Sequence, residues 1–330
     1  MGTGALKTTL ASLALLAFTA EARAFDCAKA SGKFEKAICA DASARSADGA
    51  LNKSFAELLA ASDPKMRKAI ASSEVAWLQD RDNACADAAA AGLGSCLARE
   101  SDRRRAFLTG QPEQGPGAPG KIAPWFRFEK GGKGKAAVDM ELLKFADPKS
   151  PGERAFNAAA DKLLEDISEP EKDDPAADRY AFSTRMRLVY ASPKLVSAQA
   201  ESYQDSGGAH PNSGIVNINL DVAAGRLLKF DDAFDGKSAE KIFATCLEQI
   251  KRAKKERIGD DAPLSSEDLV DLAKTVKEST GDLAAWSFGA TEATVTYNPY
   301  AVGAYAEGSY ECTLAYSALK SLVRPAFPLP

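Results

Sequence analysis

The sequence contains a single histidine, His210, among 330 residues, and this scarcity excludes most histidine chemistry. One chain cannot build a metal site with two imidazole ligands, and a general base would have to be another residue type. No two of the six cysteines are spaced as CxxC, which removes the usual zinc and redox motifs. We therefore expect no metal, no cofactor and no enzymatic activity. A glycosidase that works through two carboxylates remains an alternative, although no recognisable motif pairs two acids.

The chain also lacks an excess of positive charge. It has 42 Lys and Arg against 46 Asp and Glu, a net charge of −4. Nucleic acid is therefore not an expected partner, because binding it requires cations that neutralise phosphates. A basic protein fits the charge better. With 27% charged and 45% hydrophobic residues, the composition is that of a globular protein, and the length suggests about two domains.

Long apolar runs are absent as well. The apolar run at 10–18 follows Lys7 and precedes a small-residue site ending at Ala24, which is the pattern of a cleavable signal peptide over residues 1–24. The residues before Cys27 are not those of a lipoprotein signal. We expect a periplasmic or secreted protein of 306 residues with a net charge of −5 and no membrane span after cleavage. In that compartment six cysteines predict disulfides.

A Pro- and Gly-rich segment at 110–120 divides the chain and predicts a linker. Residues 25–109 show helical periodicity, whereas residues 121–330 repeatedly alternate apolar and polar side chains. The sequence therefore predicts an α+β multidomain protein. Its N-terminal part is an all-α, disulfide-bonded helical hairpin or bundle, and its C-terminal part is an α+β domain with an antiparallel sheet and packed helices.

The helical part is expected to turn at Asp63-Pro64, an N-cap followed by proline at the first helical position. The four cysteines of this part allow three pairings. Symmetry about the turn favours nested bonds, with Cys39 joined to Cys85 and Cys27 joined to Cys96. Local bonds look harder, because about 11 helical residues span some 16 Å against a Cα limit near 7 Å.

In the second part, alternation predicts half-buried strands at 138–142, 182–190, 216–222, 295–297 and 310–316, with helices at 153–166, 238–257 and 265–279. Cys246 shares the apolar face of its helix with Ile242 and Ile250. Cys312 alternates with polar residues on a strand, so both cysteines point at the core and a bond between them is expected. Such a bond would contribute about 4 kcal/mol in the chain-entropy model.

Specific motifs in the helical part resemble a known family. They are Phe25-Asp26-Cys27, Glu35-Lys36-Ala37-Ile38-Cys39, Ala76-Trp77-Leu78, Arg81-Asp82 with Cys85, and Cys96. This pattern is similar to the LprI-like lysozyme-inhibitor N-terminal domain of bacterial envelope proteins, over about residues 25–109. The resemblance implies an exported protein that binds lysozyme.

The second part resembles the extracellular domain of the lysozyme-sensing anti-sigma factor RsiV and of PdaC-type peptidoglycan deacetylases. The matching residues are Tyr203 with Gly207-Gly208-Ala209-His210-Pro211-Asn212, the strand Asn217-Ile218-Asn219-Leu220-Asp221 with Gly225, and Tyr297-Asn298-Pro299-Tyr300 with Gly308. No transmembrane helix precedes this part, so anti-sigma signalling is not expected. The deacetylase chemistry belongs to a separate metal domain that one histidine cannot supply.

Five residues are candidates for contact with a partner: Tyr203, His210, Asn212, Tyr300 and Tyr305. A structural turn is the favoured role for the histidine, and core packing is the default role for the tyrosines of this segment, with a partner-facing platform as the alternative. The leading hypothesis is that the protein binds and inhibits lysozyme by steric occlusion of its cleft, since animal-type lysozymes are basic and residues 121–330 carry a net charge of −5. The alternative is a peptidoglycan- or glycan-binding module of envelope maintenance without inhibition.

Overall fold

The computed structural model describes residues 26–165, 167–171, 174, 176–259 and 265–330. The predicted signal peptide lies outside these residues. Within the described ranges, no helix has both the length and the apolar character that crossing a bilayer requires.

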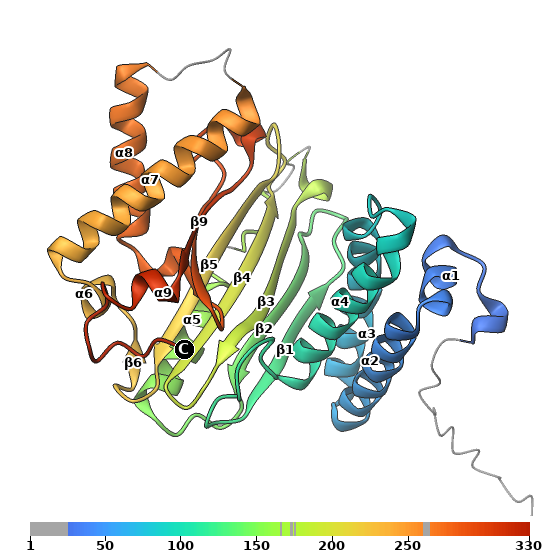
Figure 1. The fold of residues 1–330 in the computed structure, drawn as a ribbon. Helices are drawn as coiled ribbons and strands as arrows, with labels where there is room; N and C mark the ends of the chain where they lie inside the picture. The colour runs from blue at the N-terminus through green and yellow to red at the C-terminus, as the bar shows by residue number, and fades with distance from the viewer. Residues whose placement is uncertain (1–25, 166, 172–173, 175, 260–264) are drawn as a thin grey trace, which may run out of the picture.

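Four helices form the N-terminal part (Figure 1): α1 (Lys33–Ala40), α2 (Ala42–Ala61), α3 (Pro64–Ala84) and α4 (Ala90–Thr109). The predicted turn is present, because the Asp63 carboxylate accepts a hydrogen bond of 2.9 Å from the Met66 amide and Pro64 opens α3. The sequence Gly92-Leu93-Gly94 predicts a break in the second long helix, and this prediction is wrong. α4 begins at Ala90 and continues through Gly92, and the chain turns instead between Cys85 and Ala89.

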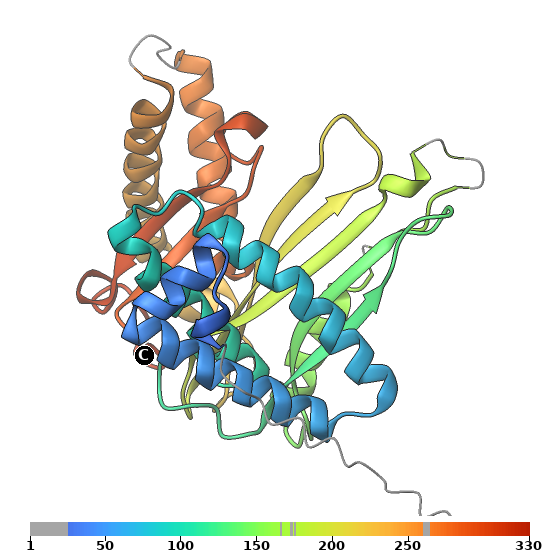
Figure 2. The ribbon, with the colours of Figure 1, turned by 90° about the vertical axis from the view of Figure 1, so that its right-hand side faces the viewer.

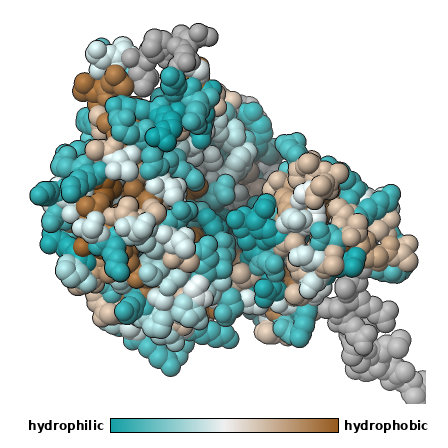
Figure 3. Space-filling view, in the orientation of Figure 1, coloured by the Kyte–Doolittle hydropathy of each residue, from teal (hydrophilic) through white to brown (hydrophobic). Residues whose placement is uncertain are grey.

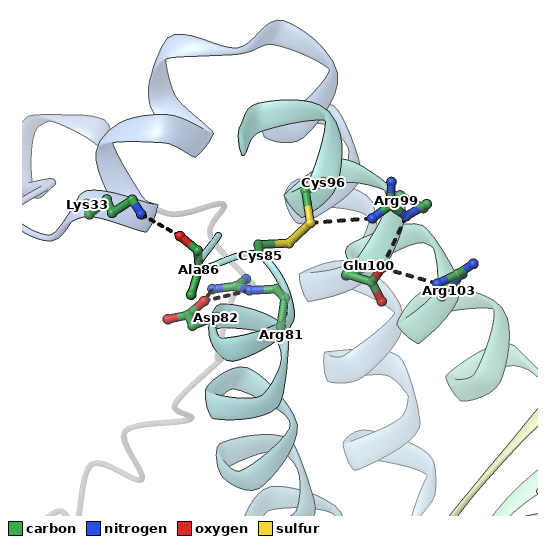
Figure 4. Close-up of a disulfide and its surroundings, with 9 residues drawn as sticks. All are labelled: Lys33, Arg81, Asp82, Cys85, Ala86, Cys96, Arg99, Glu100 and Arg103. Atoms are coloured by element: carbon green, nitrogen blue, oxygen red, sulfur yellow. Dashed lines mark hydrogen bonds and ion pairs between the residues drawn. A yellow bond between two sulfur atoms is a disulfide. The ribbon is translucent and has the colours of Figure 1, made fainter. Parts of the chain in front are cut away.

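The six cysteines form three disulfides, two of them local. Cys27 bonds to Cys39 and Cys85 to Cys96, with Cα separations of 5.6 and 5.9 Å, so the nested pairing predicted from the sequence is wrong. Neither pair is separated by one continuous helix. Cys27 lies in a single 3₁₀ turn (Cys27–Lys29) before α1, and Cys85 caps the end of α3 (Figure 4).

The packing of the helices gives a second reason for the local bonds. α2 packs mainly along α4 and only slightly against α3, which lies against strand β1 instead. Figure 2 shows α3 crossing in front of the strands. Residues equidistant from the turn at Asp63 therefore move apart along the two helices rather than facing each other, and the symmetry argument fails.

The main sheet has six strands in the order of the chain: β1 (Ile122–Glu129), β2 (Ala137–Phe145), β3 (Ala181–Ala191), β4 (Leu195–Asp205), β5 (Asn212–Asp221) and β6 (Arg226–Leu227). It is mixed rather than purely antiparallel, because β2 and β3 run parallel. A parallel pair needs a crossover, and the segment containing α5 (Pro151–Lys162) supplies it.

The two faces of this sheet are covered by different elements. α5 packs on one face, against β2 and β5. On the other face, α3 and α4 cover β1 to β3, while the C-terminal elements contact β4 and β5. Apolar side chains of α3 and α4, including Trp77 and Phe107, share one core with Phe126 and other sheet residues. The helical part is thus one layer of the fold.

The C-terminal elements build a second, smaller unit. They are α6 (Phe230–Ala233), α7 (Gly236–Ile258), α8 (Ser266–Thr280), β7 (Trp286–Phe288), β8 (Glu292–Tyr297), β9 (Tyr310–Ala315) and α9 (Tyr316–Leu319). β7, β8 and β9 form an antiparallel sheet. The predicted bond between Cys246 in α7 and Cys312 in β9 is present, in a core that contains Trp286 and Tyr297.

The segment 110–120 between the helices and β1 is anchored to the sheet. The amide of Glu113 donates to the Leu188 carbonyl at 2.8 Å, and the amide of Gly117 donates to the Ala191 carbonyl at 3.0 Å. A Pro- and Gly-rich composition predicts the absence of regular structure here, but not that the segment runs along β3. We propose the boundaries 25–109 and 121–330 as domain limits, with this anchored segment between them.

Candidate functional site

Three of the five candidate residues meet at one end of the main sheet. His210 lies in the β4–β5 connection, and its ring stacks on Tyr305 with centroids 4.0 Å apart. Its Nε2 atom lies 2.7 Å from the hydroxyl of Tyr300. Tyr300 and Tyr305 belong to the β8–β9 connection, so segments about 90 residues apart in sequence form this aromatic cluster. Tyr300 as a whole is 60% exposed.

A side-chain clamp joins the β8–β9 connection, which carries Tyr300 and Tyr305, to strand β5. The Asn298 amide accepts a hydrogen bond of 2.8 Å from the Ile215 amide and donates one of 3.0 Å to the Ile215 carbonyl. This side chain occupies the outer edge of β5 as a neighbouring strand would. Tyr300 has φ of 71°, a conformation that non-glycine residues seldom adopt and that is often associated with function.

A buried ion pair fixes the other end of the β8–β9 connection. Lys254 of α7 donates to Glu307 at 2.6 Å and to the Val302 carbonyl at 2.8 Å, and the Tyr310 hydroxyl donates to Glu307 at 2.6 Å. Burial alone would raise the pKa of Glu307, but these hydrogen bonds outweigh it and lower the pKa to about 2. A Cβ at Gly303 would lie 2.5 Å from the Glu307 carboxylate, so a larger residue there would have to displace this side chain from its ion pair.

Glu307→Gln is expected to remove an acid-sensitive part of the stability. Because the folded pKa of Glu307 is about 2, below its ordinary 4.5, its contribution is present above pH 4.5 and is lost as the pH falls toward 2. Urea unfolding at pH 7, 4 and 2.5 should therefore show a difference between wild type and variant that shrinks with acidification. Glu311→Gln, on exposed β9 surface, is the control. A difference independent of pH would contradict this assignment.

The other two candidate residues lie on the strands that lead to the aromatic cluster. Asn212 is exposed at the start of β5, opposite Gln204. Tyr203 is 42% exposed on β4, opposite Ser213. The structure places neither of them in the ring contacts of the cluster. Their role as contact residues stays a prediction.

A groove between the helices and the main sheet was missed by the sequence analysis. We call it the intermodule groove; it has a volume of about 600 Å³. Its floor includes Arg185, Glu201 and Tyr203, and its wall includes Trp77 and Glu100. Figure 3 shows that the surface in this region is hydrophilic. The sequence carries little signal for it, because of these three floor residues only Arg185 falls on a predicted strand, whereas Glu201 and Tyr203 lie on β4, which alternation did not predict.

A buried ion network beside this groove was also missed. Arg104 of α4, 2% exposed, donates to Glu74 of α3 at 2.9 Å and to Glu141 of β2 at 2.7 Å. The single hydroxyl hydrogen of Ser73 is shared between Glu141 and Asp139, whose carboxylate oxygens both lie within hydrogen-bonding distance of its Oγ. The arginines at 103–105 look like a solvated helix face in the sequence, and Asp139 and Glu141 look like the wet side of a strand. Their burial against each other can be predicted only if the packing of α3 and α4 on the main sheet is known.

The aromatic cluster and the intermodule groove both have the character of binding sites. Both are suited to binding, because they present rings, amides and paired charges. Among the described residues, no group of His, Cys, Asp and Glu is placed to hold a metal ion. The architecture is that of a disulfide-bonded helical domain packed onto an α+β unit.

Comparison with known proteins identifies two domains. Residues 27–108 match the family described as lysozyme inhibitor LprI, and residues 231–317 match DUF3298, a family described as a protein of unknown function. The chain thus contains an LprI lysozyme-inhibitor domain and a DUF3298 domain, and neither description names an enzyme. Strands β1 to β6 lie between the two matched ranges. No curated protein matches the chain.

Two solved structures of DUF3298 proteins are similar to this chain. The protein from Bacteroides fragilis NCTC 9343 is 17% identical, with a TM-score of 0.44, over 62% of this chain and 94% of that one. The protein from Pseudomonas aeruginosa PAO1 is 20% identical, with a TM-score of 0.40, over 63% of this chain and 96% of that one.

Proposed function

We propose that this protein is an exported envelope protein that binds lysozyme and inhibits it by occluding the substrate cleft. The observation that carries the proposal is the LprI lysozyme-inhibitor domain at residues 27–108. Steric occlusion needs rigid anchors and no chemistry, and the two local disulfides stiffen this domain. Three disulfides in the described chain also suit a protein that functions in an oxidising compartment.

The helical domain exposes a small apolar patch that could serve as an anchor. Val75 is 69% exposed and Leu78 is 40% exposed, three residues apart on α3, so they share one helical face. Trp77, on the opposite side, is buried against the sheet. An exposed apolar pair on a helix held firmly from behind is a suitable contact for a protein partner.

The charge distribution favours a basic partner. Residues 121–330 carry a net charge of −5 and residues 25–110 a net charge of +1. The acidic part would steer a basic lysozyme toward the molecule, and salt would slow this association. The aromatic cluster of His210, Tyr300 and Tyr305, together with Tyr203 and Asn212, is the second candidate contact surface.

A cell-wall clearing assay tests this function. The full mature chain should slow the clearing of a wall suspension by an animal-type lysozyme. The double variant Val75→Ser/Leu78→Ser should weaken inhibition by about tenfold, the equivalent of one anchor contact. Val270→Ser, which removes a 67% exposed side chain from α8, is the matched control. Full clearing at a hundredfold excess of the wild-type protein would refute lysozyme inhibition.

The second candidate function is peptidoglycan binding without inhibition, and the exposed ring of Tyr300 favours it. Sedimentation with insoluble peptidoglycan separates the two functions. If the protein pellets with the wall polymer and clearing by lysozyme is unchanged, the glycan-binding function replaces inhibition. A Tyr300→Ala/Tyr305→Ala variant then shows whether the aromatic cluster makes the contact.

A further inference from the structure

The floor of the intermodule groove is an uncovered part of the main sheet. β3 and β4 are interior strands, each paired on both sides. Glu201 is nevertheless exposed and Tyr203 is 42% exposed on β4, where a third layer would normally cover them. The helices α3 and α4 cover this face of the sheet as far as Arg185 of β3, which pairs with Asp80 of α3. The β7–β9 unit covers it from Ser197 of β4 onward, where the Ser197 hydroxyl accepts a hydrogen bond from the Phe288 amide. The gap between these two layers is the groove.

Most charges that line the groove are already neutralised. Arg185 contacts Asp80, Asp139 and Glu141. The guanidinium of Arg81 is bound to Asp82, and Glu100 is paired with Arg99 and Arg103 (Figure 4). A strongly charged ligand would therefore have to break existing ion pairs, and its net electrostatic gain would be small.

Several uncharged polar groups in the groove have no hydrogen-bond partner within the described chain. The indole N–H of Trp77 donates no hydrogen bond, and the hydroxyls of Tyr203, Ser183 and Ser213 make none. Glu201 is the one carboxylate of the groove without an ion pair or hydrogen bond among the described residues. The groove thus combines free donors, free acceptors and the face of an exposed ring.

From this combination we propose that the intermodule groove is a saccharide-binding site. A neutral sugar presents many hydroxyls to the free polar groups and an apolar C–H face to the ring of Tyr203. A carboxylate such as Glu201 can accept hydrogen bonds from two adjacent hydroxyls. The volume of about 600 Å³ lies within the usual range for small-ligand sites and accommodates a short oligosaccharide.

The topology argues against an extended peptide as the occupant. Peptides that bind to sheets add a strand to a free edge, where backbone groups are available. The floor strands β3 and β4 have no free edge, so a peptide would gain only side-chain contacts. The site is independent of the lysozyme contact proposed above, because it lies on the sheet side of α3, whereas Val75 and Leu78 lie on the outer side.

Calorimetric titration of the full mature chain with a soluble N-acetylglucosamine tetramer, without lysozyme, tests the site. The wild type should bind, and Tyr203→Ala and Glu201→Gln should each weaken binding by about tenfold or more. Both side chains are exposed, so urea midpoints should be unchanged. Val270→Ala is the control, because it truncates a 67% exposed side chain on α8, outside the groove. It should bind like the wild type.

Three outcomes would overturn the assignment. The first is the absence of binding to both the N-acetylglucosamine tetramer and a glucose tetramer at 10 mM, roughly the weakest affinity expected for a specific site. The second is binding that Tyr203→Ala and Glu201→Gln leave unchanged, which places the sugar elsewhere. The third is binding of a simple alkylamine, sensitive to Glu201→Gln, with no sugar binding, which makes the groove a cation site. Loss of lysozyme inhibition alone would leave the expected titration result unchanged.

Discussion

Arg104→Ala is expected to lower the free energy of unfolding by about 3–5 kcal/mol, the usual cost of removing one partner of a buried ion pair. Arg104 is 2% exposed, and its two carboxylate partners, Glu74 and Glu141, are 12% and 2% exposed. Without the guanidinium, both carboxylates would stay in a low-dielectric site with no cation at hydrogen-bonding distance from Glu74. Urea unfolding at pH 7 measures the loss.

The same substitution should show a defined pH dependence. Burial raises the pKa of Glu74 and of Asp139 even in the intact network. A carboxyl whose pKa is raised on folding stabilises the protein below its unfolded pKa, and that stability is lost as the pH rises through the folded pKa. Removing Arg104 removes an interaction that lowers the pKa of Glu74, so the deficit of the variant should grow from acidic to neutral pH.

A variant in which Glu74 and Glu141 are also made neutral is the control for the Arg104 substitution. In the triple variant Arg104→Met/Glu74→Gln/Glu141→Gln, no buried charge of this trio remains, so most of the stability should return. Arg103→Ala, on the same helix but 46% exposed at its side chain, should change stability by less than about 1 kcal/mol. If Arg104→Ala and Arg103→Ala cost the same, the network makes no special contribution to the docking of the helices.

This network shows which features of the fold the sequence could not predict. Alternation correctly predicted strand β2, because Val138, Met140 and Leu142 form one continuous buried apolar face of the strand. It also predicted that Asp139 and Glu141 lie on the opposite face of the strand, which they do. Their burial depends on α3 and α4, and no local pattern in either segment specifies that these two surfaces meet.

Strand β4 was missed for a related reason. Ala198 and Ala200 are small residues with weak β propensity, so the segment shows little contrast between its faces. Small side chains are needed there because layers approach β4 from both sides. Ser197 bonds to Asn219 at 2.7 Å and accepts from the Phe288 amide at 3.0 Å. The first half of β4, at 195–200, is buried on both faces and therefore carries no alternation to detect.

The candidate site was predictable only in part. His210 and Tyr300 could be singled out because each sits in a Gly- and Pro-rich connection between predicted strands, where binding residues concentrate. The contact between these two residues forms only because the β8–β9 connection packs beside β5, where Asn298 bonds to Ile215. Asn298 and Ile215 are 83 residues apart, so no local pattern predicts this contact. The local disulfides escaped prediction because they depend on where the helices end, and helix ends are the least certain feature of a sequence-based assignment.

Replacing both Cys246 and Cys312 with alanine is expected to lower the free energy of unfolding by about 4 kcal/mol. The bond closes a loop of 66 residues, and the chain-entropy model assigns about that much to restraining such a loop in the unfolded chain. Both sulfurs are fully buried, so small cavities add to the loss. Changing both cysteines together avoids a free thiol, and urea unfolding at pH 7 again provides the measurement.

The position of this bond should also make the substitution visible at the aromatic cluster. Cys246 lies two helical turns before Lys254 on α7, and Lys254 holds the β8–β9 connection through Glu307. Hydrogen exchange of the amides around Tyr300 and Tyr305 should therefore accelerate in the variant. The matched control is Cys27→Ala/Cys39→Ala, whose loop of 12 residues predicts a smaller loss of about 3 kcal/mol and no change at the cluster. If both pairs lowered the stability equally and neither changed exchange near Tyr300, the Cys246–Cys312 bond would have no specific role in holding that loop.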